Sequence, residues 1–204
     1  MQNKLNKTVR TGFRDIDAAL AVMIGTLLLG VVLGTLSYCF MPQSTVDLLS
    51  AAVKDFVGFR QTADFGHLLI SSFFSATLFI AAEFLLGLFA LGQLPELLVL
   101  VYRGSGLGII LSQAYVNTDR NRIVLVILFI VPALVISCYS LALAAKEAVR
   151  MSSRMMTLLL VNKPCPGLLD HFKNYAVRFA AIEALTAVAA AVDCISSLLI
   201  ASKL

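Results

Sequence analysis

The stretch GQLPELLVLVYRGSGLG, residues 92–108, is apolar enough to cross a membrane but contains several features that interrupt helices. Pro95 lies near its start, Arg103 lies in its second half, and four of its residues are glycine. A charge and helix breakers inside a membrane segment need partners from neighbouring helices. The meaning of the stretch therefore depends on the rest of the chain.

The composition of the chain is that of an integral membrane protein. Of its 204 residues, 59% are hydrophobic and only 14% are charged, and the mean hydropathy is +0.91. Soluble domains are about 45–50% apolar and about 25% charged. Apolar runs of about 20 residues recur, which is the length that crosses ~30 Å of hydrocarbon. We predict one domain over residues 1–204, an all-α polytopic membrane bundle.

Five transmembrane helices are expected from the apolar runs. They cover residues 18–40, 68–91, 94–116, 123–145 and 177–200. A signal peptide is the alternative for the first run, but its apolar core is too long and no cleavage site follows. The third span is expected to be either a continuous helix or one that unwinds locally at its glycines.

Orientation follows from lysine and arginine residues, which are retained on the cytoplasmic side. With five alternating crossings, ten of these residues flank the spans on the side of the amino terminus and five flank them on the other side. The amino terminus is thus expected in the cytoplasm. A re-entrant third segment would export the loop that carries six of the basic residues, so a crossing segment is favoured.

The loop between the first two spans is predicted to contain an external amphipathic helix over residues 45–59. Apolar residues recur there with helical spacing: Leu48, Leu49, Ala52, Val53, Phe56 and Val57. Ser44, followed by Asp47, is a candidate helix start. The apolar face either binds the outer leaflet or a partner, through Leu49, Val53, Phe56 and Val57, or covers the outer face of the bundle itself.

Two further helical patterns concern packing and charge. Small residues form stripes on the first span (Thr26, Gly30 and Gly34) and on the fifth (Ala180, Ala184, Ala187 and Ala191). Such stripes permit close helix packing, which we expect within the chain, with a homo-oligomer as the alternative. After the fourth span, Lys146, Arg150 and Arg154 form a basic row. It indicates a basic helix end, or contact with anionic lipid headgroups.

Ionisable residues at membrane depth are costly and are therefore candidates for function. Glu83 and Arg103 lie at matching depth in adjacent spans, which predicts an ion pair, with Glu183 as a second candidate partner. The pair is expected to be structural, and a transport or proton-relay site is the alternative. Asp193 lies near the outer end of its span, and Glu96 suits the first turn of a helix.

Enzymatic chemistry finds little support. A hydrolase needs a nucleophile, a histidine and a carboxylate in contact, but His67 and His171 are predicted at opposite membrane faces. The glycines at 104, 106 and 108 lack the spacing and the βαβ unit of a nucleotide loop. The cysteines, Cys39, Cys138, Cys165 and Cys194, follow no metal-ligand spacing. We therefore expect no enzyme, cofactor, metal site or nucleic-acid partner.

The string LLGLFALGQLPELLVLVYRGSGLG, residues 85–108, resembles the core motif of the stage II sporulation protein M family. In that motif a helix ends at L-G, a G-x-P turn follows, and a short apolar helix leads into a basic residue and two glycines four places apart. The matching positions are Gly87, Gly92, Pro95, Arg103, Gly104 and Gly108. The motif covers about a tenth of the chain.

The resemblance implies a non-enzymatic, multi-pass scaffold of the bacterial cell membrane. Such a scaffold recruits a peptidoglycan hydrolase complex, formed with stage II sporulation proteins D and P, to the septal membrane during forespore engulfment and cell wall remodelling. Related proteins also occur in organisms that do not sporulate. A small transporter or channel subunit, with a midplane site at Glu83, Arg103 and Glu183, is the alternative function.

Overall fold

The computed structural model describes the backbone of residues 2–62, 64–117, 120–161 and 168–201. Side chains are described over most of this range, apart from 2–17, 53–54, 56–57, 59–62, 114, 117, 120–131, 161, 168 and 198–201. Every regular element in the described part of the chain is an α-helix, as the sequence predicted. The helices are α1 (Gln2–Cys39), α2 (Gln43–Thr62), α3 (Phe65–Leu86), α4 (Gln93–Asn117), α5 (Arg120–Val161) and α6 (Leu168–Ala201).

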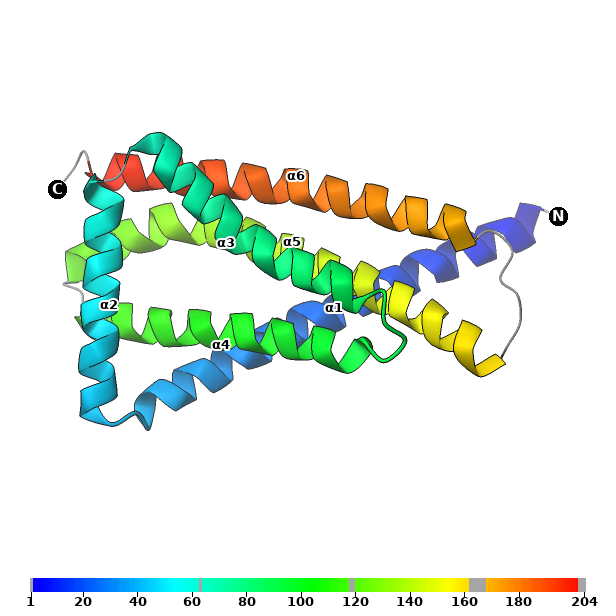
Figure 1. Ribbon diagram of the computed structural model, residues 1–204, viewed down its shortest axis with the longest axis horizontal. Coiled ribbons are helices and arrows are strands. Elements are labelled where there is room, and N and C mark those ends of the chain that lie inside the picture. Colours follow the sequence, from blue (N-terminus) through cyan, green and yellow to red (C-terminus); the bar gives the residue numbers. More distant parts are fainter. Residues whose placement is uncertain (1, 63, 118–119, 162–167, 202–204) are drawn as a thin grey trace.

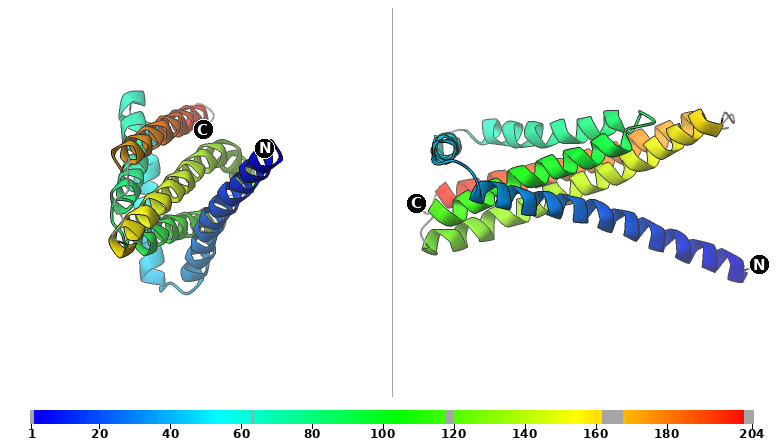
Figure 2. Two further views of the ribbon diagram at one scale, coloured as in Figure 1. Left: turned by 90° about the vertical axis from the view of Figure 1, so that its right-hand side faces the viewer. Right: turned by 90° about the horizontal axis from the view of Figure 1, so that it is seen from below.

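Five of the helices run lengthwise and the sixth, α2, lies across one end of them (Figure 1). The chain starts at the opposite end, which is also the end of the α3–α4 turn, and it finishes near α2. We call these the N-terminal end and the α2 end. Seen from the side, α1 diverges from the other long helices towards its start (Figure 2). At the N-terminal end, α1 and α5 extend past the α3–α4 turn.

The five lengthwise helices each contain a segment long and apolar enough to cross a membrane. These segments are Ala18–Cys39, Phe65–Leu86, Gln93–Gln113, Pro132–Leu160 and Leu169–Ser197. Large apolar side chains on them are exposed, as Val22, Phe74 and Leu98 are. Such a surface suits contact with lipid rather than with water. The chain is therefore a multi-pass membrane protein with five spans.

Several boundaries differ from those predicted from the sequence. The third span is one continuous helix, so local unwinding at its glycines was the wrong alternative. α5 has 42 residues, about 63 Å at ~1.5 Å per residue, and it continues past the fourth span to Val161, as expected from the basic helix end after residue 145. α6 begins at Leu168 rather than at 177. In these additional segments Ala148 and Met151 of α5 and Tyr175 of α6 are buried in one cluster, so the two helices pack against each other there as well.

The core is built largely from small residues of α5 packed against α6. On α5, Ala144, Ala145 and Ala148 are fully buried. The face of α6 that meets them carries larger groups, at Tyr175, Phe179, Ile182 and Thr186. The predicted alanine stripe of α6 does not pack within the chain: Ala180, Ala184 and Ala187 are exposed and Ala191 is half-buried.

Candidate functional site

The α3–α4 turn brings the first half of the motif into the packed core. α3 ends at Leu86 and α4 begins at Gln93, with Gly87 and Gly92 both buried between them. A Cβ on Gly87 would lie 2.9 Å from Ala148 Cα and closer still to the Tyr175 hydroxyl. A Cβ on Gly92 would overlap the Leu86 carbonyl. Gly87 therefore packs tightly under α5 and α6, and Gly92 packs tightly within the turn itself.

The second half of the motif forms the crossing between α4 and α1. Gly104 and Gly108 face Gly30 and Gly34, so that each helix presents two glycines four residues apart. Any Cβ at these four positions would collide with the backbone of the facing helix. Gly106, by contrast, meets nothing within 4 Å. The predicted packing stripe of the first span is thus confirmed, and it packs within the chain.

The predicted ion pair between Glu83 and Arg103 does not form. Among the described residues, neither carboxylate oxygen of Glu83 has a hydrogen-bond partner, although the side chain is fully buried. The Arg103 guanidinium instead lies 4.9 Å from the centroid of the Phe79 ring, a cation–π contact. Ser137 and Ser140 of α5 line the same small cavity. Glu83 and Arg103 therefore face different neighbours.

A second buried carboxylate, Glu96, lies on the other side of the α3–α4 turn from Glu83. Glu96 lies in the first turn of α4, as predicted, and its amide donates to the Gly92 carbonyl at 3.0 Å. It too is fully buried, and its oxygens have no hydrogen-bond partner among the described residues. The Glu96 carboxylate lies against the α3–α4 turn, where a Cβ on Gly92 would be 3.0 Å from one of its oxygens. Uncompensated burial of two charges is costly, so this pair calls for a proton or a cation.

Glu183 and Asp193 bind α3 rather than Arg103. The Thr77 hydroxyl donates a hydrogen bond to Glu183, and the Ser72 hydroxyl donates to Asp193 at 2.8 Å. Both bonds join α6 to α3. The three residues proposed for a midplane transport site, Glu83, Arg103 and Glu183, are therefore not brought together.

The helix predicted between the first two spans is present and longer than predicted. α2 begins at Gln43, where the Thr45 amide donates to the Pro42 carbonyl at 2.9 Å. The proposed start at Ser44 was therefore wrong, because that residue already lies inside the first turn. Leu48 is 73% exposed and Leu49 is half-buried. The side chains of Val53, Phe56 and Val57 lie outside the described residues.

A hydrogen bond near the middle of α2 joins this helix to the bundle. The Gln113 amide of α4 donates to the Ser50 hydroxyl at 3.2 Å, and Gln113 itself is buried. This bond fixes α2 across the end of the bundle, in agreement with its perpendicular course in Figure 1. The face bearing Leu48 is left exposed.

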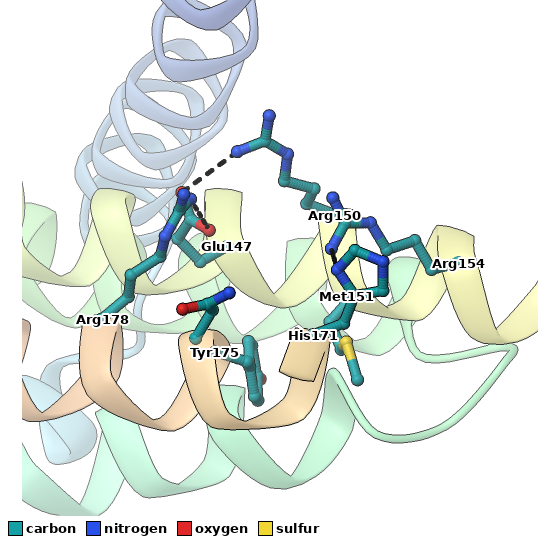
Figure 3. Close-up of a pocket in the computed structure, with 8 residues that line it drawn as sticks. Glu147, Arg150, Met151, Arg154, His171, Tyr175 and Arg178 are labelled. Atoms are coloured by element: carbon teal, nitrogen blue, oxygen red, sulfur yellow. Dashed lines mark hydrogen bonds and ion pairs between the residues drawn. The ribbon is translucent and has the colours of Figure 1, made fainter. Parts of the chain in front are cut away.

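A basic pocket of about 110 Å³ lies between α5 and α6 near the N-terminal end (Figure 3). Its lining comes from one face of each helix: Glu147, Arg150, Met151 and Arg154, and His171, Asn174, Tyr175 and Arg178. The sequence indicated only the α5 row, and Lys146 of that row does not line the pocket. The positions 171, 174 and 178 repeat with helical spacing, which was the available signal on α6.

The two histidines lie on different elements, His67 near the start of α3 and His171 near the start of α6. Within the described residues, no three His, Cys, Asp or Glu side chains gather as a metal site. Cys165 lies outside the described residues. Cys194 is buried and Cys138 is half-buried, but Cys39 is exposed, so the cysteines are not all core residues.

Three comparisons with known proteins returned no match: a scan against protein-family models, a search of curated proteins and a search of solved structures.

Proposed function

We propose that this chain is a non-enzymatic scaffold of a bacterial cell membrane, similar to stage II sporulation protein M. In this proposal its amino terminus is cytoplasmic, and it anchors a peptidoglycan hydrolase complex at the septal membrane during engulfment. Its partners are the counterparts of stage II sporulation proteins D and P. The chemistry belongs to those partners, and the chain supplies a fixed position in the membrane.

The observation that carries the proposal is the placement of α2. This 20-residue helix lies across the end of the bundle and is held by the bond between Ser50 and Gln113. The positive-inside rule places that end outside the cell, on the side of the wall. Leu48 leaves an apolar group exposed on a helix outside the five spans. An external helix that is hydrogen-bonded to the bundle and exposes an apolar side chain suits protein docking.

The roles of the motif residues agree with a scaffold. Gly87, Gly92, Gly104 and Gly108 each bring backbone against backbone or against a buried side chain. Pro95 lies in the first turn of α4, where a missing amide hydrogen costs little. The motif therefore builds a compact bundle that holds α2 in place.

Crosslinking inside cells tests the proposal. A photo-crosslinking amino acid at Leu48 should capture a wall hydrolase or its membrane-anchored partner. The matched control is Ile110 of α4, which is also apolar and exposed but lies within a span. If both positions give the same protein products, or if Leu48 captures only lipid, α2 has a passive role and the scaffold proposal fails.

Transport remains a second candidate because of Glu83 and Glu96. Two buried carboxyl groups with no partner among the described residues are unusual in a purely structural bundle. A protein that moves protons or cations uses such groups. The two functions differ in one measurable respect, since only a transporter loses its function when both residues become glutamine.

A further inference from the structure

The basic pocket between α5 and α6 combines a cavity with an excess of positive charge. Three arginines line it, and Glu147 is the one carboxylate in its lining. Arg178 donates to Glu147 at 2.7 Å, and Arg150 lies 3.8 Å from the same carboxylate. Two formal positive charges are therefore left over within the lining. A cavity of 110 Å³ exceeds the ~10–15 Å³ that one water requires.

Arg154 has an unusual neighbour for an arginine. One of its guanidinium nitrogens lies 3.2 Å from Nδ1 of His171, and the two side chains point towards each other in Figure 3. An arginine can only donate, so Nδ1 accepts and the proton of the neutral ring is on Nε2. Among the described residues, no carboxylate lies within ion-pair distance of Arg154. The remaining guanidinium donors are available to an anion.

The pocket lies at the level of the α3–α4 turn. On α5, the Ser152 hydroxyl donates to the Phe89 carbonyl in that turn at 2.8 Å. On α6, the Tyr175 hydroxyl donates to the Phe84 carbonyl at 3.0 Å. Since a turn between two spans marks the edge of the bilayer, the pocket lies at the depth of lipid headgroups.

Apolar side chains are exposed in the same turns of α6 as the pocket residues. Leu169 and Val177 are each 68% exposed, and Phe172 is 39% exposed. A segment that pairs basic residues with exposed apolar groups suits the interface, where headgroup and acyl chain are contacted together.

We propose that this pocket binds a phosphoryl group, carried either by an anionic lipid of the adjacent leaflet or by free phosphate or a phosphate ester. Arg154 and the Nε2–H of His171 supply donors on one side, and Arg150 and Arg178 supply them on the other. Glu147 lies within ion-pair distance of Arg150 and Arg178 and positions these two side chains. Planar guanidinium groups match phosphate oxygens in two-point hydrogen bonds. This proposal does not rest on the proposed function.

Native mass spectrometry of the purified full-length chain tests the lipid source. Added phosphatidylglycerol should be retained in preference to phosphatidylcholine, because only the former carries a net negative charge. Arg154→Gln should lower retention about tenfold, since it removes charge-assisted hydrogen bonds. Lys173→Gln is the control, because Lys173 is an exposed basic residue of α6 that does not line the pocket. It should leave retention unchanged.

Inorganic phosphate tests the other source. In phosphatidylcholine nanodiscs, free phosphate should raise the melting temperature if the site takes soluble phosphate, and it should have no effect if the site needs a lipid. Asn174→Asp adds a negative charge at an exposed pocket position and should weaken binding even if Arg154→Gln fails to fold. Binding of neither probe would overturn the proposal. Equal losses in Arg154→Gln and Lys173→Gln would overturn it as well.

Discussion

Gly30 of α1 lies so close to Val101 of α4 that a Cβ on the glycine would be 2.5 Å from the valine carbonyl oxygen. The same close approach recurs one turn further on, between Gly34 and Ser105. The motif helix is thus fixed against the first span by backbone contact. In lipid, where apolar groups gain little from burial against one another, such close packing is a main source of helix association.

Replacement of Gly30 by alanine should therefore destabilise the bundle. The added methyl group forces the two helices apart, at a cost of about 1–3 kcal/mol. Gly25→Ala is the matched control on the same helix, because no atom lies within 4 Å of a Cβ at that position. Thermal unfolding in detergent should show a lower melting temperature for Gly30→Ala alone. Equal melting temperatures would mean that α1 and α4 do not pack in this way.

The motif glycines of α4 should behave in the same way. Gly108→Ala should lower folded yield, because a Cβ there collides with the Val31 carbonyl. Gly106→Ala should be tolerated or mildly stabilising, since alanine is favoured over glycine in helices by about 1 kcal/mol. The folded yield of both variants is measured after size-exclusion chromatography. Sensitivity at Gly106 equal to that at Gly108 would indicate that the glycines act through flexibility instead of packing.

Glu83→Gln is expected to keep or raise the folded yield. The carboxylate has no counter-charge among the described residues, and glutamine has nearly the same shape without the charge. The double replacement Glu83→Arg with Arg103→Glu should not restore a fold that Arg103→Glu has lost, because the two side chains face different neighbours. A loss of yield in Glu83→Gln that the charge swap repairs would reinstate the ion pair.

The stability that Arg103 contributes to the fold should depend on its cation–π contact with the Phe79 ring. Phe79→Leu keeps an apolar side chain but removes the π face, which contributes about 0.5–2 kcal/mol to holding the guanidinium. The melting temperature should fall for Phe79→Leu in the wild-type background and change little once Arg103 is methionine. Additive effects of the two replacements would show that the ring and the guanidinium are not coupled.

Topology can be checked by labelling Cys165 with a membrane-impermeant thiol reagent. The predicted orientation places residues 162–167 in the cytoplasm, between the ends of α5 and α6. Intact cells should leave Cys165 unlabelled, and opened cells should label it. A variant that lacks the other cysteines isolates the signal. Labelling in intact cells would reverse the orientation and place α2 on the cytoplasmic side.

The sequence was informative about elements and depth, and less so about which way side chains face. The spans and the helix between the first two follow from apolar runs. The turn between the second and third spans was expected at Gly92 and Pro95, but it covers residues 87–92, because α3 ends at Leu86 and Pro95 already lies inside α4. Glu83 and Arg103 were paired on depth alone, but rotation about each helix axis decides the partner. Both faces of a membrane helix are apolar, so periodicity did not show that α6 packs through Tyr175 and Phe179 instead of the stripe of Ala180, Ala184 and Ala187.

The sequence did not reveal the basic pocket between α5 and α6 for a related reason, because the pattern on one helix does not show which helix packs against it. The row Lys146, Arg150 and Arg154 looks like an ordinary basic helix end when α5 is considered by itself. Only the antiparallel packing of α6 adds His171 and Arg178 to it and separates Lys146 from it. Charge patterns on single helices therefore predicted the type of residue but not the site.

The central claim, that α2 holds a wall-remodelling partner, is tested most directly by affinity purification of the tagged chain from membranes of its own organism. Wild type should copurify a peptidoglycan hydrolase or its membrane anchor. Leu48→Asp should lose that partner. Its folded yield and membrane insertion should stay at the level of the Gly106→Ala variant, which is expected to be tolerated. If no wall protein copurifies with the wild type, or if Leu48→Asp retains it in full, the account is contradicted.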